Sequence, residues 1–457
     1  MAAPSPARTA ALKALVRVEQ DRAYAPLALS AALGPSLSRR DRALATELVY
    51  GTLRWQGQID YYLQAFSHRP LDKLSAWSRA ALRLAVYQAL FMDSVPLPVA
   101  ASESVLLVKE REPWAAGYVN GVLRAFSRGW QEVAFPDPGE NPAAYLAAAA
   151  SHPQWLVARW LSRWGFERTE QICRSNNRAA PVTVRVNGTV TGVDSLEEAF
   201  ARARIPVERG RLSPSALRLQ RTGAVQGLPG FEAGHFQVQD ESSQLVAWVV
   251  DPHPGHRVAD LCAGPGGKST HLAELLALRG AGPQDPPVTA VELHPHKARL
   301  IEESAARLGL SERIRTLAAD ARELGPQHGV FDRVLVDVPC SGTGVLRRRP
   351  DLRWQRGAED LPALVKLQRE LLRAAARVTA PGGVLVYSTC SLEPEENREV
   401  FEWFLREFPE FEPSPIQGFL PEPARSRLSA AGPVLEILPD EFETDGFFIF
   451  RAARRAS

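Results

Sequence analysis

The stretch that decides the fold is RVADLCAGPGGKST at residues 257–270, where a short apolar strand leads into a glycine-rich turn and then a helical stretch. Small residues let the backbone approach a ligand closely, and the start of the helix presents unpaired N–H groups. The turn ends in Gly267-Lys268-Ser269, like a loop that binds nucleoside triphosphates. That motif needs a glycine at position 262, which is a cysteine here. A triphosphate-binding loop is therefore disfavoured.

Short apolar runs alternate with helical stretches through the C-terminal half. The runs lie at 258–260, 288–292, 334–337 and 384–387. Buried strands that alternate with helices predict a parallel sheet with crossover helices. We therefore expect a Rossmann-like α/β domain over residues 236–457, with its ligand site at the carboxyl ends of the strands.

Glu292 ends the second predicted strand, Asp320 follows a third strand and Asp337 ends the fourth. A carboxylate at Glu292 can accept hydrogen bonds from both ribose hydroxyls of a nucleoside, and Asp320 could accept one from an adenine amino group. The glycine-rich turn alone would fit an ordinary strand-to-helix connection. Because parallel strand ends converge on one crevice, the turn and the three acids together predict a nucleoside site.

Residues 1–130 show a different pattern. They are rich in alanine and leucine, and apolar residues recur at helical spacing, as at Ile59, Tyr62, Leu63 and Phe66. This segment is expected to be an all-helical domain.

A linker and a small module are expected between the two domains. Closely spaced prolines disfavour regular structure near residue 140, so 131–149 is interpreted as a linker. Residues 150–235 mix strand and helix patterns, with a strand at 181–186 and a helix that starts at a capping box of Ser195 and Glu198. We interpret 150–235 as a small α/β, RRM-like module that binds RNA.

Composition limits the possible classes of protein. With 457 residues, 45% of them hydrophobic and 23% charged, the chain fits a globular protein of two or three domains. A net charge of only +2 means that a nucleic-acid surface must be a local patch. Without a bilayer-length apolar run or a signal-peptide pattern, a cytoplasmic protein that does not bind membranes is expected.

The four cysteines are Cys173, Cys262, Cys340 and Cys390, and no two of them form a CxxC pair. We therefore expect no metal site and a reducing compartment. Cys340 and Cys390 follow the fourth and fifth predicted strands, so both thiols belong at the ligand edge of the sheet. Cys173 and Cys262 are interpreted as small buried hydrophobic residues.

Cytosine methylation at C5 gives two such thiols a purpose. C5 is a poor nucleophile until a thiolate adds to C6, after which it can attack a methyl sulfonium. The C5 proton must then leave so that the sulfur can be expelled, and a second group such as Cys340 could act as that base. Asp337 could hydrogen-bond the ring and stabilise the adduct.

Three segments carry a resemblance to a known family. They are LCAGPGGK at 261–268, DVPCSGTG at 337–344 and STCS at 388–391. These resemble the motifs of RNA 5-methylcytosine methyltransferases of the NOL/NOP2/Sun group. The resemblance implies that Cys390 is the nucleophile and that Cys340 assists product release. DNA cytosine methyltransferases attack with the Pro-Cys thiol and lack the other, so the presence of both favours RNA.

The resemblance also implies the cofactor and its contacts. S-adenosylmethionine would be the methyl donor. The residues that the family's motifs place against it are Cys262, Ala263, Gly264, Pro265, Gly266, Gly267, Lys268, Glu292, Asp320 and Asp337. Relatives more often have Ala at the position of Gly264 and Asp at that of Glu292. The first departure is expected to be harmless, while the longer carboxylate puts cofactor affinity in question.

The N-terminal segment extends the resemblance over nearly the whole chain. LVYGTLR at 48–54 and YVNGVLR at 118–124 resemble the antitermination factor NusB, an all-helical RNA-binding fold. A NusB-like domain joined to this catalytic domain implies a protein that acts on 16S rRNA, either free or in an early small-subunit particle. We expect a monomer. By family analogy alone, the base is the cytosine numbered 967.

A cationic run directly follows the Cys340 loop. Arg347, Arg348 and Arg349 are expected to contact RNA phosphates, and Trp354 to stack on a base. A solvated loop with a core tryptophan is the alternative.

Three classes of function are compared: a methyltransferase, a nucleotide triphosphatase, and a non-catalytic RNA-binding factor with a relic α/β domain. The missing glycine disfavours the triphosphatase. A relic would have no need for both Cys340 and Cys390, so the methyltransferase is preferred.

Overall fold

The computed structural model describes residues 4–220, 223–429 and 432–456, which form two compact units. One unit consists of the described residues of Met1–Ala179 together with Leu346–Ala358. The other consists of those of Ala180–Val345 and Glu359–Ser457. No helix in these described ranges is long and apolar enough to cross a membrane.

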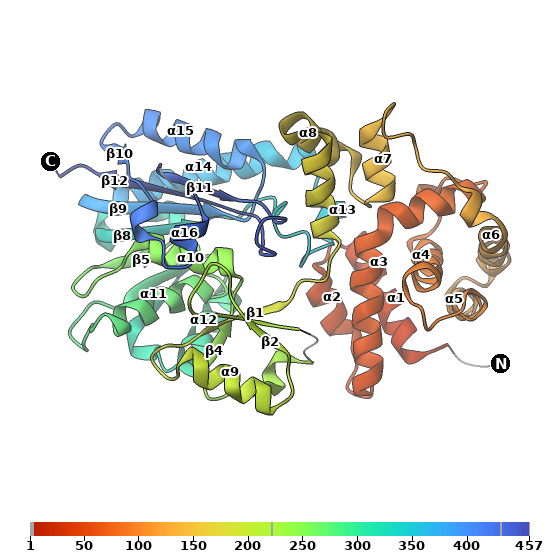
Figure 1. Ribbon diagram of the computed structural model, residues 1–457, viewed down its shortest axis with the longest axis horizontal. Helices are drawn as coiled ribbons and strands as arrows, with labels where there is room; N and C mark the ends of the chain where they lie inside the picture. Colours follow the sequence, from red (N-terminus) through yellow and green to blue (C-terminus); the bar gives the residue numbers. More distant parts are fainter. Residues whose placement is uncertain (1–3, 221–222, 430–431, 457) are drawn as a thin grey trace. The chain divides into compact units, whose positions relative to one another are not determined.

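The first unit is built of helices (Figure 1). They are α1 (Pro6–Gln20), α2 (Ala25–Ala32), α3 (Arg39–Phe66), α4 (Ala76–Phe91), α5 (Leu97–Arg111), α6 (Ala116–Gly129), α7 (Pro142–Ala149), α8 (Gln154–Asn176) and the short α13 (Leu352–Gln355). Helix α3 starts where the Ser38 hydroxyl accepts a hydrogen bond from the Asp41 backbone N–H. Helix α4 is buried along most of its length and packs against α1, α3 and α5. Ile59, Tyr62 and Leu63 lie in this core as their spacing predicted.

The expected linker at 131–149 is wrong in its extent. Irregular chain runs only from residue 133 to 141, and α7 then begins at Pro142 because proline is tolerated in the first turn of a helix. The Asn141 side chain caps that turn by accepting a hydrogen bond from Ala144. Helices α7 and α8 pack against each other and α7 contacts α3, so by their contacts both helices lie in the helical unit.

The segment 346–358 is a further correction, since it was expected to belong to the Rossmann-like domain. Its Arg353 side chain is buried and donates hydrogen bonds to the carbonyl oxygens of Arg54, Ser151 and Asn176. All three acceptors belong to the helical unit. Their hydrogen bonds with Arg353 explain why the segment packs with that unit.

The second unit begins with a small four-stranded antiparallel sheet in the order β2-β3-β1-β4. Its elements are β1 (Val182–Val186), α9 (Val193–Arg202), β2 (Val207–Arg209), β3 (Ala216–Leu219) and β4 (Phe236–Val238). The predicted strand at 181–186 is confirmed. The capping box is wrong, because α9 begins two residues before Ser195 with Gly192 at its N-cap. The module also extends past 235, because β4 pairs with β1.

The large sheet of the same unit has the order β10-β12-β9-β8-β5-β6-β7, with β11 paired to β12. Its strands are β5 (Val258–Asp260), β6 (Val288–Glu292), β7 (Ile314–Ala318), β8 (Phe331–Asp337), β9 (Thr379–Thr389), β10 (Phe411–Pro413), β11 (Val434–Ile437) and β12 (Phe447–Arg454). Strands β5 to β9 are parallel, as predicted, whereas β12 runs antiparallel to β9.

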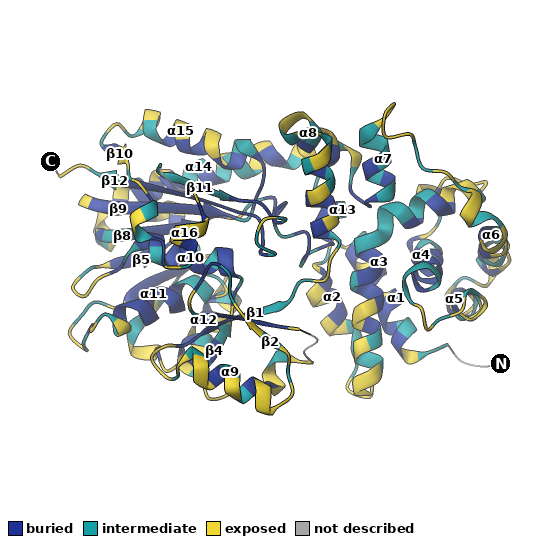
Figure 2. Ribbon diagram, in the orientation of Figure 1, coloured by how far each residue is buried: buried dark blue, intermediate teal, exposed yellow. Residues whose placement is uncertain are grey.

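Helices cover both faces of this sheet, and its central strands are buried (Figure 2). They are α10 (Glu241–Val250), α11 (Gly267–Leu278), α12 (Pro295–Arg307), α14 (Leu361–Val378), α15 (Arg398–Glu407) and the short α16 (Ala424–Arg427). Helices α10 and α11 contribute to one core cluster, while α14 and α15 contribute to another. The strand order reverses between β5 and β8, which opens a crevice at their carboxyl ends.

Arg185 on β1 joins the small sheet to the large one. Its buried side chain donates to the Glu274 carboxylate at 3.1 Å, to the Gly267 carbonyl at 2.8 Å and to the Thr270 hydroxyl at 3.2 Å. All three partners lie on α11, so the small module is fastened to the helix that follows the glycine-rich turn.

Candidate active site

A cavity of about 300 Å³ lies at the carboxyl ends of β5 to β8. Its wall is formed by Leu261, Cys262, Gly264, Glu292, Leu293, His294, Lys297, Asp320, Ala321, Arg322, Asp337, Val338, Pro339, Leu367 and Leu371. The three predicted acids therefore line one cavity. This volume is at the lower end of the usual range for small-molecule sites.

Only part of the glycine-rich turn faces this cavity. Cys262 and Gly264 line it, whereas Ala263 is buried against Ala290 and Ile301. Gly266 has φ of 103°, a left-handed conformation that favours glycine, and a Cβ there would come within 3.1 Å of the Ile301 Cα. The Pro265 ring is exposed, and Gly267 begins α11. The turn thus positions two cavity residues and the start of a helix.

Glu292 and Gly264 depend on each other. The buried Glu292 carboxylate accepts hydrogen bonds from the backbone N–H groups of Gly264 and His294, both at 3.0 Å. A Cβ on residue 264 would lie 2.4 Å from Glu292 Oε2. The longer carboxylate of Glu292 therefore fits because residue 264 is glycine. Glycine in place of alanine and glutamate in place of aspartate are thus two parts of one structural feature.

Asp320 is held by a neighbouring arginine that the sequence did not single out. The Arg322 guanidinium donates to both Asp320 oxygens and, at 3.0 Å, to Glu370. These hydrogen bonds lower the pKa of Asp320. The carboxylate is therefore kept ionised and can still accept from a ligand, since each oxygen has two lone pairs.

Asp337 links the glycine-rich turn to β9, the strand that precedes Cys390. One of its oxygens accepts from the Lys268 ammonium at 2.6 Å and the other from the Ser388 hydroxyl at 2.7 Å. Ser388 lies on β9, two residues before Cys390. Lys268, which was predicted to contact the cofactor, therefore forms an ion pair with Asp337.

The two strand-end thiols are in direct contact. The Sγ atoms of Cys340 and Cys390 are 3.2 Å apart, although the residues are separated by 50 positions in the chain. The hydrogen bond with Cys390, followed by burial, raises the pKa of Cys340 well above its ordinary value. Cys340 therefore keeps its proton at neutral pH and can donate it toward the Cys390 sulfur.

The other two cysteines are apart from this pair. Cys173 is fully buried in α8, and burial raises its pKa to about 12. Cys262 lines the cavity, and burial, with neighbouring carboxylates, raises its pKa well above the ordinary value. Cys173 is buried as predicted, whereas Cys262 is only half-buried and lines the cavity, which corrects its interpretation as a buried hydrophobic residue. Within the described ranges no group of His, Cys, Asp or Glu is arranged to hold a metal ion.

The predicted RNA contacts of the cationic run need correction. Arg347 is buried and donates to the Ala179 carbonyl, whereas Arg349 pairs with the Asp351 carboxylate and lies over the Tyr24 ring. Arg348 is partly buried. The buried Arg347 is therefore a correction, whereas Arg348 and Arg349 are partly exposed and their RNA contacts stay a prediction.

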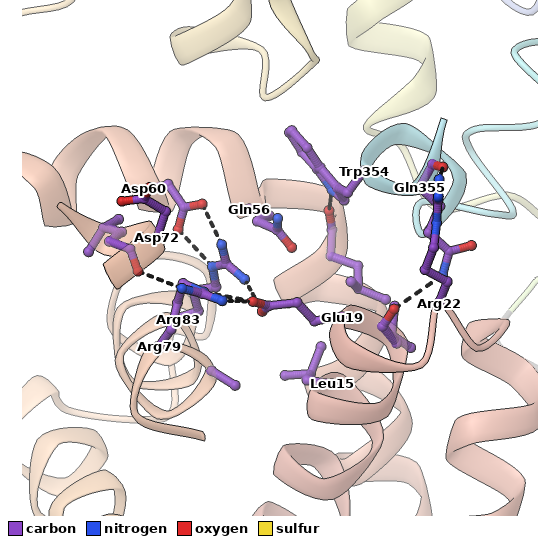
Figure 3. A pocket seen from close by; sticks show the side chains of 14 residues that line it. Leu15, Glu19, Arg22, Gln56, Asp60, Asp72, Arg79, Arg83, Trp354 and Gln355 are labelled. Atoms are coloured by element: carbon purple, nitrogen blue, oxygen red, sulfur yellow. Dashed lines mark hydrogen bonds and ion pairs between the residues drawn. The ribbon is translucent and has the colours of Figure 1, made fainter. Parts of the chain in front are cut away.

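Trp354 is partly buried against the core of the helical unit, as in the alternative interpretation of a tryptophan that packs inside the protein. Its indole N–H donates to the Leu53 carbonyl at 2.6 Å, and its ring packs against the helical core. It lines a cavity of about 540 Å³ in this unit, beside the ion pairs of Arg83 with Glu19 and Asp60 (Figure 3). The ring is therefore half-buried and held within the helical unit, and stacking on a base stays a prediction.

Comparisons with known proteins agree with this architecture. Family models match residues 5–128 (NusB family), 152–226 (ferredoxin-like domain, RsmF/B-like) and 247–452 (16S rRNA methyltransferase RsmB/F). They confirm the predicted fold class: a NusB-like helical region, a small α/β module and a C-terminal α/β domain.

Similar sequences span nearly the whole chain. The chain is 41% identical over 447 residues to the probable ribosomal RNA small subunit methyltransferase B of Bacillus subtilis, covering 97% of both chains. It is 36% identical over 405 residues to ribosomal RNA small subunit methyltransferase B of Pseudomonas putida, covering 88% of this chain and 89% of that one. The crystal structure of PH0851 superposes with a TM-score of 0.81 at 29% identity and covers 99% of each chain.

Proposed function

This chain belongs to the 16S rRNA methyltransferase RsmB/F family, and from that premise we propose that it methylates C5 of a cytosine in small-subunit rRNA through a covalent bond between Cys390 and C6. The methyl donor is S-adenosylmethionine. The base is the one numbered 967, by family analogy, and the RNA is either free or part of an early small-subunit particle.

The observation that carries the proposal is the contact between two thiols beside a nucleoside-sized cavity. Cys340 and Cys390 lie 3.2 Å apart at the ends of β8 and β9, and Asp337 of the cavity wall hydrogen-bonds Ser388 next to them. A methyl donor in the cavity and a base over the sulfurs would meet at this edge of the sheet.

The cavity residues suit a nucleoside cofactor. Glu292 ends β6 with a buried carboxylate that can accept from ribose hydroxyls, and Asp320 lies on the same wall. Leu367 and Leu371 on α14 supply an apolar side for an adenine ring. S-adenosylmethionine bound there supplies an electrophilic methyl group.

The two thiols have different roles: Cys390 forms the covalent bond to the base, and Cys340 handles the C5 proton. The Cys390 thiolate forms the S–C6 bond, which makes C5 nucleophilic enough to take the methyl group. Cys340 is the protonated partner in the resting enzyme, because its pKa is raised. After it has released its own proton to solvent, the Cys340 thiolate takes the C5 proton. The electron pair of that C–H bond re-forms the C5–C6 double bond, the S–C6 bond breaks and Cys390 leaves as a thiolate.

A denaturing gel tests these roles. With RNA and S-adenosylmethionine present, Cys390→Ala should abolish methyl transfer, whereas Cys340→Ala should accumulate a slower, RNA-dependent protein band. The Cys340→Ala/Cys390→Ala double variant should lack that band. If Cys390→Ala traps the adduct and Cys340→Ala is inert, the thiols have the roles found in DNA methyltransferases.

The modified position needs a separate measurement. Bisulfite sequencing of unmethylated 16S rRNA, after incubation with enzyme and cofactor, should show one protected cytosine. Protection at a cytosine other than 967 would change the assigned position but leave the chemistry standing.

A further inference from the structure

Glu396 is a buried carboxylate close to the two thiols, and the chemistry proposed above gives it no role. It ends the 3₁₀ turn η9 (Pro394–Glu396) and its exposed fraction is 0%. No ion pair involving Glu396 occurs among the described residues. A buried carboxylate without a cation is costly unless hydrogen bonds compensate for it.

Four donors compensate for its burial. The Ser341 backbone N–H and the Gln368 side-chain amide each donate to Oε1 at 2.9 Å. The hydroxyls of Ser341 and Ser391 each donate to Oε2 at 2.5 Å. Every donor is uncharged, so the carboxylate is held by hydrogen-bond geometry alone.

The donors show that the Glu396 carboxylate connects the loops of the two cysteines. Ser341 directly follows Cys340, and Ser391 directly follows Cys390. A single side chain therefore fastens the residues next to both thiols, on loops that end two different strands. The 3.2 Å separation of the sulfurs depends on how these loops are held relative to each other.

The next residue reinforces the same connection. The Asn397 side-chain amide donates to the Ser391 carbonyl at 2.8 Å, and its oxygen accepts from the Thr389 hydroxyl at 2.6 Å. Residues 389 and 391 flank Cys390 on both sides. Asn397 thus fixes only the Cys390 loop, whereas Glu396 reaches both loops.

We propose that Glu396 is a positioning residue that sets the spacing of Cys340 and Cys390. The proposal rests on the function proposed above, in which one sulfur adds to C6 while the other serves C5 of the same ring. Both sulfurs must then reach adjacent atoms of one base, and a shift of about 1 Å can cost on the order of 100-fold in rate.

Two substitutions separate geometry from charge. Glu396→Ala removes the acceptor of all four donors and should lower kcat for methyl transfer by about 10- to 100-fold. Glu396→Gln keeps the shape and one acceptor oxygen, and the serine hydroxyls can rotate to accept from its amide. It should recover most of the lost rate. Glu399→Ala, which removes an exposed carboxylate on α15, is the matched control and should behave as wild type.

Phenylarsine oxide measures the thiol spacing without RNA or cofactor. Its arsenic condenses with two adjacent thiols, forming two As–S bonds and releasing one water, so intact-mass spectrometry reports whether the sulfurs are in reach of each other. Wild type, Glu399→Ala and Glu396→Gln should capture one equivalent, and Cys340→Ala should capture none. Glu396→Ala should capture at least 10-fold more slowly.

The possible outcomes are distinct. Capture by Glu396→Ala at the wild-type rate, or failure of wild type to capture, would overturn the positioning role. Normal capture in wild type without any rRNA methylation would instead contradict the proposed function. If Glu396→Ala does not fold, Ser341→Ala/Ser391→Ala removes the two hydroxyl donors and leaves the carboxylate. Slower capture by that variant supports the proposal, and unchanged capture contradicts it.

Discussion

At the scale of single residues, the arrangement of the cavity wall depends on the length of the residue 292 side chain as well as on its charge. Glu292 reaches the Gly264 N–H only because no Cβ occupies that space. The sequence located both residues, but only folding brings them together, because Gly264 follows β5 and Glu292 ends β6.

This dependence predicts a compensating pair of substitutions. Gly264→Ala should weaken S-adenosylmethionine binding by about 1–3 kcal/mol, because the new methyl group displaces the Glu292 carboxylate. Glu292→Asp withdraws that carboxylate by one methylene, so Gly264→Ala/Glu292→Asp should bind better than Gly264→Ala alone. Titration calorimetry on the four proteins gives the coupling energy. Strictly additive losses would show that the two residues act independently.

At the scale of elements, the end of β5 is tied to the first turn of α11. The Ser269 hydroxyl donates to the buried Asp260 carboxylate at 2.6 Å. Burial raises the pKa of Asp260 to about 6 in spite of this hydrogen bond. The folded protein therefore binds a proton at Asp260 more tightly than the unfolded chain does.

This pKa predicts a pH-dependent effect of Asp260→Asn. The stability contributed by the protonated carboxyl is complete below about pH 4, the unfolded value, and is lost as pH rises through about 6. The neutral asparagine escapes that loss, so Asp260→Asn should be more stable than wild type by about 2–3 kcal/mol at pH 8. The advantage should vanish near pH 4. Urea unfolding at both pH values measures it, and an equal difference at the two would contradict it.

At the scale of the whole molecule, the helical unit recruits chain from both sides of the small module. Segment 346–358 lies between β8 and β9 in sequence, yet Arg353 and Trp354 donate to backbone carbonyls of the helical unit. Deleting residues 1–130 would remove the Leu53 carbonyl that accepts from Trp354 and the Arg54 carbonyl that accepts from Arg353. Loss of RNA binding in such a truncation would therefore not identify an RNA surface.

Charge reversal in the full chain is the better test of RNA capture by the helical unit. Arg174 and Arg178 are exposed and line a cavity of about 390 Å³ together with Trp55 and Tyr145. Arg174→Glu/Arg178→Glu should weaken rRNA binding and lower the slope of log affinity against log salt by about 0.7–0.9 per lost phosphate contact.

The control for this test is Arg17→Glu, which changes an exposed charge on α1 of the same unit. It should leave the salt dependence unchanged, and S-adenosylmethionine affinity should be unchanged in both variants. An unaltered salt slope in Arg174→Glu/Arg178→Glu would place the RNA surface elsewhere.

The sequence by itself determined the elements and most of the reacting groups. Helical spacing, β-branched runs and glycine turns are local patterns, because they follow from backbone sterics and from which face of one element is buried. They placed Glu292, Asp320, Asp337, Cys340 and Cys390 at strand ends, and all of these ends meet at one edge of the sheet.

Only the tertiary structure decided which distant segments supply the hydrogen-bond partners of each buried polar group. Local patterns predicted an RNA surface at Arg347 and Trp354, but buried polar groups need partners, and theirs lie in the helical unit. The role inferred for Glu396 has the same origin, since its donors come from positions 341, 368 and 391. No spacing within the chain encodes such a hydrogen-bond network, because it forms only when the sheet brings those loops together.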